Sequence, residues 1–101
     1  MTVLTVSYEV REDSVADVEA AIGKMMAAIE REQPEGVRYA LGKLPDGVTF
    51  LGVLELEDGV ENPLPGIAAA REFQRSLAGW VVGDPPVPQP LQVSGSYGLF
   101  E

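Results

Sequence analysis

Apolar residues recur along this chain with two different periods, and the order of these periods restricts the fold more than any other feature. Residues 3–10 alternate between apolar and polar side chains, which predicts a half-buried strand. A helical period follows, then two strands joined at residues 45–47 (Pro-Asp-Gly), a second helical period and a last alternating segment. This order predicts an α+β domain over residues 1–101, with one four-stranded antiparallel sheet and two helices on one face.

The first predicted helix has a clear beginning, end and apolar side. Ser14 is a favourable N-cap, and Pro34 with Gly36 ends the helix. Gly23 interrupts it at a cost of about 1 kcal/mol relative to alanine, which indicates a close packing contact at that position. The apolar side is predicted to consist of Val18, Ile22, Met25 and Ile29.

The C-terminal third of the chain is predicted to contain a helix, a stiff connector and a strand. The helix is expected to begin after Pro63 or Pro65 and to end near Gly83. Four prolines in residues 83–90 predict an extended connector that crosses the edge of the sheet. The alternation of residues 91–100 predicts the fourth strand. The apolar side of the helix is predicted to consist of Ile67, Ala70, Phe73, Leu77 and Trp80 or Val81.

Composition disfavours several classes of partner. The net charge of −9 repels phosphate backbones and anionic membrane surfaces, so we expect neither nucleic acid nor a membrane as a partner. No apolar stretch approaches the roughly 20 residues that span a bilayer, and the N-terminus does not resemble a signal peptide. The absence of cysteine fits a reducing compartment, and we expect a cytoplasmic protein.

The chain also lacks the residues of several common catalytic sites. Without histidine or cysteine it has no imidazole base, no histidine haem ligand and no thiol nucleophile. A carboxylate cluster is the one candidate for Ca²⁺ or Mg²⁺, but its spacing matches no metal-binding loop, and solvated charge is the favoured interpretation. We therefore expect neither a metal nor a cofactor. The cluster consists of Glu55, Glu57, Asp58 and Glu61.

One face of the predicted sheet carries little charge. If the bulky side of each strand faces the helices, only Glu9, Arg38 and Glu55 add charge to the opposite face. Small, mildly apolar side chains suit a face that packs on a second sheet about 10 Å away, so we expect a homodimer through this face. The alternative is a monomer with an uncharged sheet surface. The other residues of this face are Val3, Thr5, Ser7, Thr49, Leu51, Val53, Ser94 and Ser96.

The strand order, the chain length and residues 73–78 (Phe-Gln-Arg-Ser-Leu-Ala) in a short second helix resemble the dimeric α/β-barrel proteins, and more narrowly the antibiotic biosynthesis monooxygenase-like domains. The resemblance covers nearly the whole chain. It implies a ferredoxin-like subunit, a homodimer whose sheets form a barrel, and a small-molecule cavity between sheet and helices. Residues 83–90 form a longer connector than the family pattern, and this connector could cover or reshape the cavity.

Six residues are predicted to bind a ligand in that cavity. Aromatic side chains suit a flat apolar molecule, and an arginine can hold an anionic oxygen. Asn62, Arg71 and Trp80 are residue types that cofactor-free oxygenases of the family employ. For each aromatic residue, the alternative is a purely structural place in the core. The six residues are Trp80, Tyr8, Tyr39, Phe73, Arg71 and Asn62.

Two hypotheses of function follow. The resemblance implies a cofactor-independent monooxygenase that oxidises a small aromatic or polyketide-like substrate with O₂; the haem-degrading branch of the family is disfavoured because it uses a histidine. The absence of histidine favours the alternative, a non-catalytic homodimer that binds a small ligand or serves a structural role. A related enzyme, an isomerase or cyclase, would need a carboxylate base such as Glu9 or Glu55 inside the cavity. The catalytic residues are not assigned.

Overall fold

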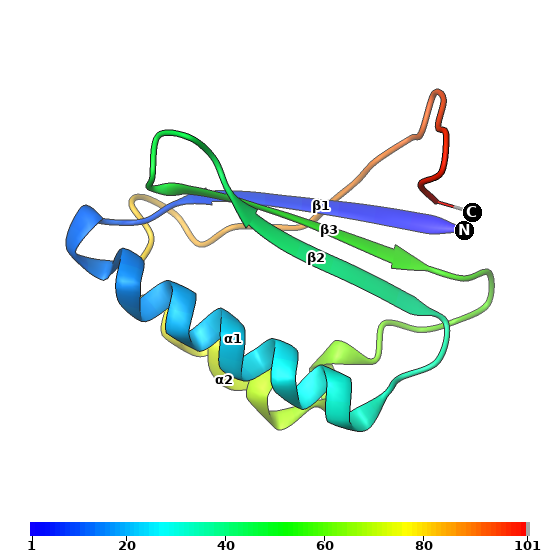
Figure 1. Cartoon of the computed structure of the whole chain (residues 1–101), viewed down its shortest axis with the longest axis horizontal. Coiled ribbons are helices and arrows are strands. Elements are labelled where there is room, and N and C mark those ends of the chain that lie inside the picture. Colours follow the sequence, from blue (N-terminus) through cyan, green and yellow to red (C-terminus); the bar gives the residue numbers. More distant parts are fainter. Residues whose placement is uncertain (101) are drawn as a thin grey trace.

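Two helices cover one face of a four-stranded antiparallel sheet (Figure 1). The computed structural model describes residues 1–100. The strands lie in the order β2-β3-β1-β4, so the first strand is central and the hairpin β2–β3 forms one side. This is the ferredoxin-like architecture predicted from the sequence. The elements are β1 (Thr2–Glu9), α1 (Val15–Glu32), β2 (Val37–Lys43), β3 (Thr49–Leu56), α2 (Ala68–Leu77) and β4 (Gln89–Pro90), with short 3₁₀ turns η1 (Glu12–Ser14) and η2 (Leu64–Gly66).

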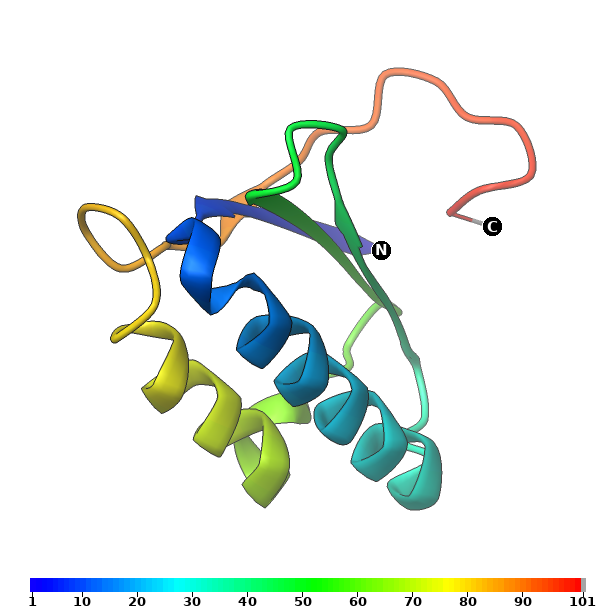
Figure 2. The same cartoon turned by 60° about the vertical axis from the view of Figure 1, so that its left-hand side comes forward.

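The strand register assigns each side chain to one of two faces. Tyr8 pairs with Phe50, and Leu4 pairs with Leu54, so these residues share the inner face that meets the helices. Val3 pairs with Glu55, which places both on the outer face. Figure 2 shows that the outer face has no helix over it. The assumption that Phe50 faces the helices is confirmed, since this side chain is 2% exposed.

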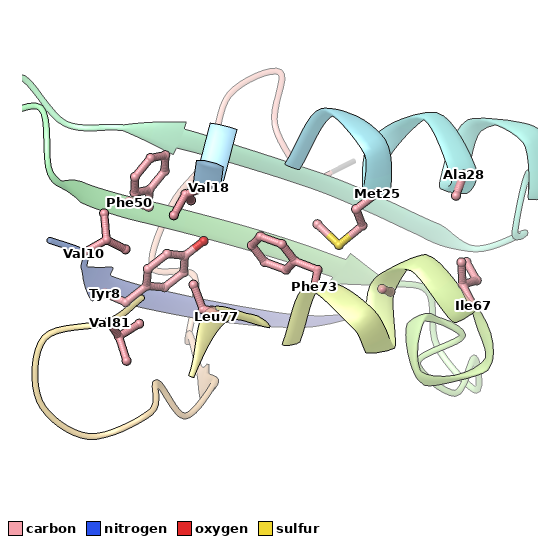
Figure 3. Close-up of a cluster of buried hydrophobic side chains, with 11 residues drawn as sticks. Tyr8, Val10, Val18, Met25, Ala28, Phe50, Ile67, Phe73, Leu77 and Val81 are labelled. Atoms are coloured by element: carbon pink, nitrogen blue, oxygen red, sulfur yellow. The ribbon is translucent and has the colours of Figure 1, made fainter. Parts of the chain in front are cut away.

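The core lies between the inner face and the two helices (Figure 3). The rings of Tyr8 and Phe50 stack with centroids 5.8 Å apart. From α1, Val18 and Met25 are fully buried against this layer, while Ile22 and Ile29 are partly buried. The predicted apolar side of the first helix is therefore confirmed.

The turn at residues 44–48 confirms the predicted hairpin. The Asp46 carboxylate accepts hydrogen bonds from the backbone N–H groups of Val48 (2.9 Å) and Thr49 (2.8 Å), and also from the Thr49 hydroxyl. These bonds, the one to the Thr49 side chain first, lower the pKa of Asp46. Gly47 has a φ of +79°, a left-handed conformation that glycine adopts without strain.

The second helix is shorter than predicted. It ends at Leu77, and the expected end near Gly83 is wrong. Gly79 follows and has poor helix propensity, and the chain then turns so that Val81 forms a bridge with Val10 beside β1. Pairing with the sheet thus replaces a further helical turn, and Trp80 lies after the helix rather than on it.

The fourth strand also differs from the prediction of residues 91–100. Only Gln89 and Pro90 form the strand, opposite Thr5 and Leu4 of β1. One more backbone bond joins the Leu91 N–H to the Val3 carbonyl (2.8 Å). Because the pairing is antiparallel, residue 93 would already lie opposite the first residue of the chain, and the later residues have no partner on β1. Residues 91–100 leave the sheet instead (Figure 2).

Gly23 is the last difference in the fold. We expected a close packing contact at this position, but a Cβ atom there would have no neighbouring atom within 4 Å. The residue is exposed, so the prediction of a close contact is wrong.

Candidate functional site

A cavity of about 330 Å³ lies between the inner face of the sheet and the helices. Its wall is mainly apolar. Side chains of β1, β3 and α2 form most of it, and both the loop before α2 and the connector after it add residues. The lining residues used below are Leu4, Val6, Tyr8, Met25, Tyr39, Gly52, Asn62, Pro65, Ala70, Arg71, Phe73, Gln74, Leu77, Pro86 and Pro88.

Gly52 is a point of close side-chain approach in the floor of the cavity. It lies in the middle of β3, between Val6 of β1 and Leu41 of β2. A Cβ atom at this position would lie 2.8 Å from Cδ2 of Leu41 and 3.0 Å from Cγ1 of Val6, so even alanine would displace its neighbours. A glycine in a central strand weakens it, and here the missing side chain leaves room for the side chains of Leu41 and Val6 to meet over the strand.

Residues 83–90, which we call the strap, form another part of the wall. Before the strap, the Val82 N–H donates to the Glu9 carbonyl (2.8 Å). At its end, Gln89 and Pro90 pair with β1. The strap therefore connects two points on the same strand, and Pro86 and Pro88 line the cavity between them.

Two tyrosines line the cavity from the sheet. Tyr8 is 7% exposed, and its hydroxyl has no hydrogen-bond partner within the described part of the chain. Burial raises the pKa of Tyr8 above its usual range, and the nearby Tyr39 adds to this effect. Burial also raises the pKa of Tyr39, which is only partly buried. Both hydroxyls are therefore neutral hydrogen-bond donors near pH 7.

Polar side chains from the loop and α2 form an exposed rim. The Asn62 side-chain oxygen accepts a hydrogen bond from the Leu64 N–H (3.0 Å), and Nη1 of Arg71 donates to the Pro65 carbonyl (2.7 Å). These bonds fix the loop before α2 and hold both side chains in place. Gln74 lies one helical turn after Arg71 and also lines the cavity. Among the described residues, Arg71 is the one cationic group of the lining, and no carboxylate is part of it.

The structure brings five of the six predicted ligand residues together: Tyr8, Tyr39, Phe73, Arg71 and Asn62 all line the cavity. Trp80 lies elsewhere. It is partly buried against the core, and its backbone carbonyl accepts a hydrogen bond from the Arg11 N–H (3.2 Å). Sequence reasoning did not select Gly52, Gln74 or the strap prolines as site residues. A lone glycine within a strand was the signal for Gly52.

The carboxylates proposed for other chemistry lie outside the cavity. Glu55 is on the outer face, where Oε2 accepts a hydrogen bond from Nη1 of Arg38 (3.1 Å). Glu9 is exposed and pairs with Thr49 on that same face. An isomerase that uses either residue as its base therefore has no base in this cavity. Within residues 1–100 no group of three or more acidic, histidine or cysteine side chains is placed to hold a metal ion.

None of the helices in the described region has the length and apolar character needed to cross a membrane.

Comparison with known proteins supports the fold assignment. No protein-family model and no curated protein matches the sequence. Among solved structures, Rv0793 of Mycobacterium tuberculosis superposes with a TM-score of 0.73 at 15% identity, over 94% of this chain and 96% of that one. A candidate antibiotic biosynthesis monooxygenase of Caulobacter crescentus gives a TM-score of 0.72 at 16% identity, over 93% and 90% of the two chains.

A third similar structure has a named activity. SnoaB of Streptomyces nogalater, a cofactor-independent oxygenase, was solved as a single-residue variant and superposes with a TM-score of 0.69 at 12% identity. The superposition covers 99% of this chain and 97% of SnoaB. The resemblance to antibiotic biosynthesis monooxygenase-like proteins is confirmed at the level of the fold: the chain has the ferredoxin-like fold of those structures.

Proposed function

We propose that the chain is a cofactor-independent monooxygenase that acts on a small aromatic or polyketide-like substrate. The observation that carries this proposal is the cavity: a mainly apolar space of about 330 Å³, whose polar lining offers hydrogen-bond donors and one arginine. A flat, electron-rich ring system is the kind of molecule that such walls accept. The shared fold with SnoaB supports the same class of reaction, although it does not specify the substrate.

The reaction needs a substrate that O₂ attacks once a proton has been lost. An activated methylene, as in anthrone, loses a proton to give an enolate; one oxygen atom of O₂ becomes the new carbonyl and the other leaves as water. No carboxylate among the described lining residues can take the proton, so we assign the proton to water at the exposed rim. Arg71 would stabilise the negative charge that develops at the reacting carbon and on the oxygen that adds to it, because a fixed cation beside a developing anion lowers the barrier.

Asn62 and the strap would position the substrate. The Asn62 side-chain oxygen is engaged by the Leu64 N–H, which leaves its amide NH₂ as a donor at the rim. Pro86 and Pro88 would lie against the ring and help to exclude water from the reacting carbon.

The active form in this proposal is a cytoplasmic homodimer that packs the outer faces of two sheets together. Leu51 is 41% exposed on this face although it lies in the middle of a strand, and the neighbouring small side chains leave it without cover. The apolar residues Leu91 and Leu99 are also exposed. A second copy of the chain would bury these side chains. No step of the proposed reaction uses a residue from the second copy.

The alternative is a homodimer of the same fold that binds a small ligand without converting it. The absence of histidine from the sequence and of carboxylates from the described lining favours it. The two proposals share the cavity and differ in turnover.

Oxygen consumption with anthrone as substrate tests the monooxygenase. We expect one O₂ consumed and one anthraquinone formed per anthrone, at a rate well above spontaneous oxidation. Ala70→Leu places a larger side chain in the cavity wall, and we expect it to reduce the rate at least tenfold. Ala68→Leu is the matched control, because Ala68 is exposed on the same helix and is not part of the lining. Saturable binding of anthrone without turnover would favour the non-catalytic alternative.

A further inference from the structure

One buried hydroxyl on the inner face makes no hydrogen bond within the described part of the chain. Tyr8 is 7% exposed and its oxygen has no hydrogen-bond partner among the described residues. Figure 3 shows the ring beside Phe50, with the hydroxyl directed into the space between the sheet and the helices, toward Phe73. The surrounding side chains that Figure 3 labels are apolar, and the nearby Tyr39 makes no hydrogen bond to the Tyr8 hydroxyl.

This arrangement is unfavourable for stability alone. A buried hydroxyl without a partner forfeits the hydrogen bonds that it makes in water, whereas a phenylalanine of nearly the same shape would bury the ring without that cost. The rest of the core around Tyr8 consists mainly of apolar side chains. An unpaired donor at such a position is the kind of local exception that marks a functional site.

We propose that the Tyr8 hydroxyl donates a hydrogen bond to a carbonyl or enolate oxygen at the inner end of the ligand, so that the cavity selects ring ketones over the corresponding hydrocarbons. The inference rests on the proposed function and deepens it by naming the feature of the substrate that is recognised. Arg71 lies at the exposed rim and Tyr8 at the buried end, so the two residues would meet a ligand at separate points.

The protonation of Tyr8 suits this role. Burial raises its pKa, so the hydroxyl keeps its proton at neutral pH and remains a donor. Beside an enolate, a neutral donor stabilises the negative charge without adding a second one.

The Tyr8 hydroxyl is closed off from solvent, so a ligand must displace a neighbouring side chain to reach it. Met25, Phe73 and Leu77 line the same cavity as Tyr8. Met25 is the side chain best suited to move, because it is unbranched and has three rotatable bonds. Recognition of the ketone is therefore coupled to a local rearrangement of the wall.

Two stable probes that differ in one oxygen test the proposal. 9-Fluorenone is a planar tricyclic ketone, and fluorene has a methylene group in place of the carbonyl. We measure the binding of both by equilibrium dialysis to the full chain and to Tyr8→Phe. We expect the variant to lose about tenfold in affinity for fluorenone and to bind fluorene as the unaltered chain does. Tyr97→Phe is the matched control, because Tyr97 is 98% exposed.

Thermal melting supplies a second, independent readout. Without ligand, Tyr8→Phe is expected to melt several degrees higher, because it removes an unpaired buried hydroxyl. A lower melting temperature would show that the hydroxyl has a structural partner and would overturn the proposal. Equal losses for both probes, an unchanged fluorenone affinity, or no binding of either probe to the unaltered chain would overturn it as well.

The outcomes also separate this inference from the proposed function. Discrimination between the probes without oxygen consumption on anthrone would retain the role of Tyr8 in a binding protein and exclude the monooxygenase. Oxygen consumption that is equal in Tyr8→Phe, together with equal fluorenone affinity, would retain the enzyme and exclude the role of Tyr8.

Discussion

The two faces of the sheet bury polar groups in different ways. On the inner face, Tyr8 lines a cavity, and its hydroxyl is buried among mainly apolar side chains. On the outer face, the Glu55 carboxylate is 6% exposed and one of its oxygens bonds to Arg38, while the other has no partner among the described residues. Both residues lie in the central pair of strands β1 and β3, but on opposite sides of it.

This difference in buried polar groups indicates that the inner face suits a small-molecule ligand and the outer face suits a protein partner. A neutral hydroxyl next to a cavity suits a small molecule, because a single acceptor atom of the ligand satisfies its hydrogen-bond donor. A carboxylate held by an arginine on a sheet face with little charge suits a second protein surface, where a donor can pair with the remaining oxygen. Substitutions on each face therefore separate ligand binding from association.

The largest expected effect is on association through the outer face. Leu51→Lys would place two lysines in a symmetric interface, so we expect the dimer of two 10.8 kDa chains to dissociate at micromolar concentration. The dissociation constant should rise at least a hundredfold, measured by analytical ultracentrifugation. Leu44→Lys is the matched control, since Leu44 is equally exposed (42% against 41%) but lies in the turn after β2. An unchanged mass for Leu51→Lys would contradict the proposed interface.

A smaller effect is expected from the buried carboxylate itself. Arg38→Met removes a hydrogen-bond partner of Glu55, and we expect the free energy of unfolding to fall by about 1–3 kcal/mol in urea titrations. The double variant Arg38→Met with Glu55→Met should recover most of the loss, because no buried charge then remains. Arg75→Met on exposed α2 surface controls for the lost charge. Equal stability of the single and double variants would show that the carboxylate is adequately solvated.

The smallest expected effect is on the free energy of unfolding, from a substitution outside both faces of the sheet. Gly23→Ala in α1 should raise the free energy of unfolding by about 0.5–1 kcal/mol, because alanine favours the helix and meets open space there. Gly36→Ala should do the opposite: Gly36 has a φ of +75°, and a Cβ atom would lie 2.7 Å from Cγ2 of Val60. Thermal melting measures both, and a loss of stability in Gly23→Ala would reveal a contact in solution that the structure lacks.

Much of the fold follows from local patterns in the sequence. The alternation of β1 places Leu4, Val6 and Tyr8 on one face, and the helical period of α1 places Val18 and Met25 opposite them. Five of the six predicted ligand residues line one cavity, because four of them belong to β1, β2 or α2 and the fifth, Asn62, lies in the loop before α2. Periodicity is sufficient there, since each side chain's direction depends on its own element.

The predictions failed where long-range pairing decides the structure. The end of α2 depends on the bridge between Val81 and Val10, which are far apart in the sequence. The length of β4 is limited by how few residues of β1 precede Leu4, which pairs with Pro90. Trp80 is predicted as a ligand residue because cofactor-free oxygenases of the resembled family employ this residue type; its role stays a prediction, and the structure places it against the core. Neither pairing leaves a local signal in the residues that it affects.

The strap has a consequence for the entropy of the unfolded chain. Four prolines restrict residues 83–90 before folding, so the chain loses less backbone freedom when this segment is fixed against β1. A cavity wall can therefore form from a segment that has few hydrogen bonds of its own. For the same reason a ligand that contacts Pro86 and Pro88 meets a surface that is already ordered, and its binding energy is not consumed in ordering that wall.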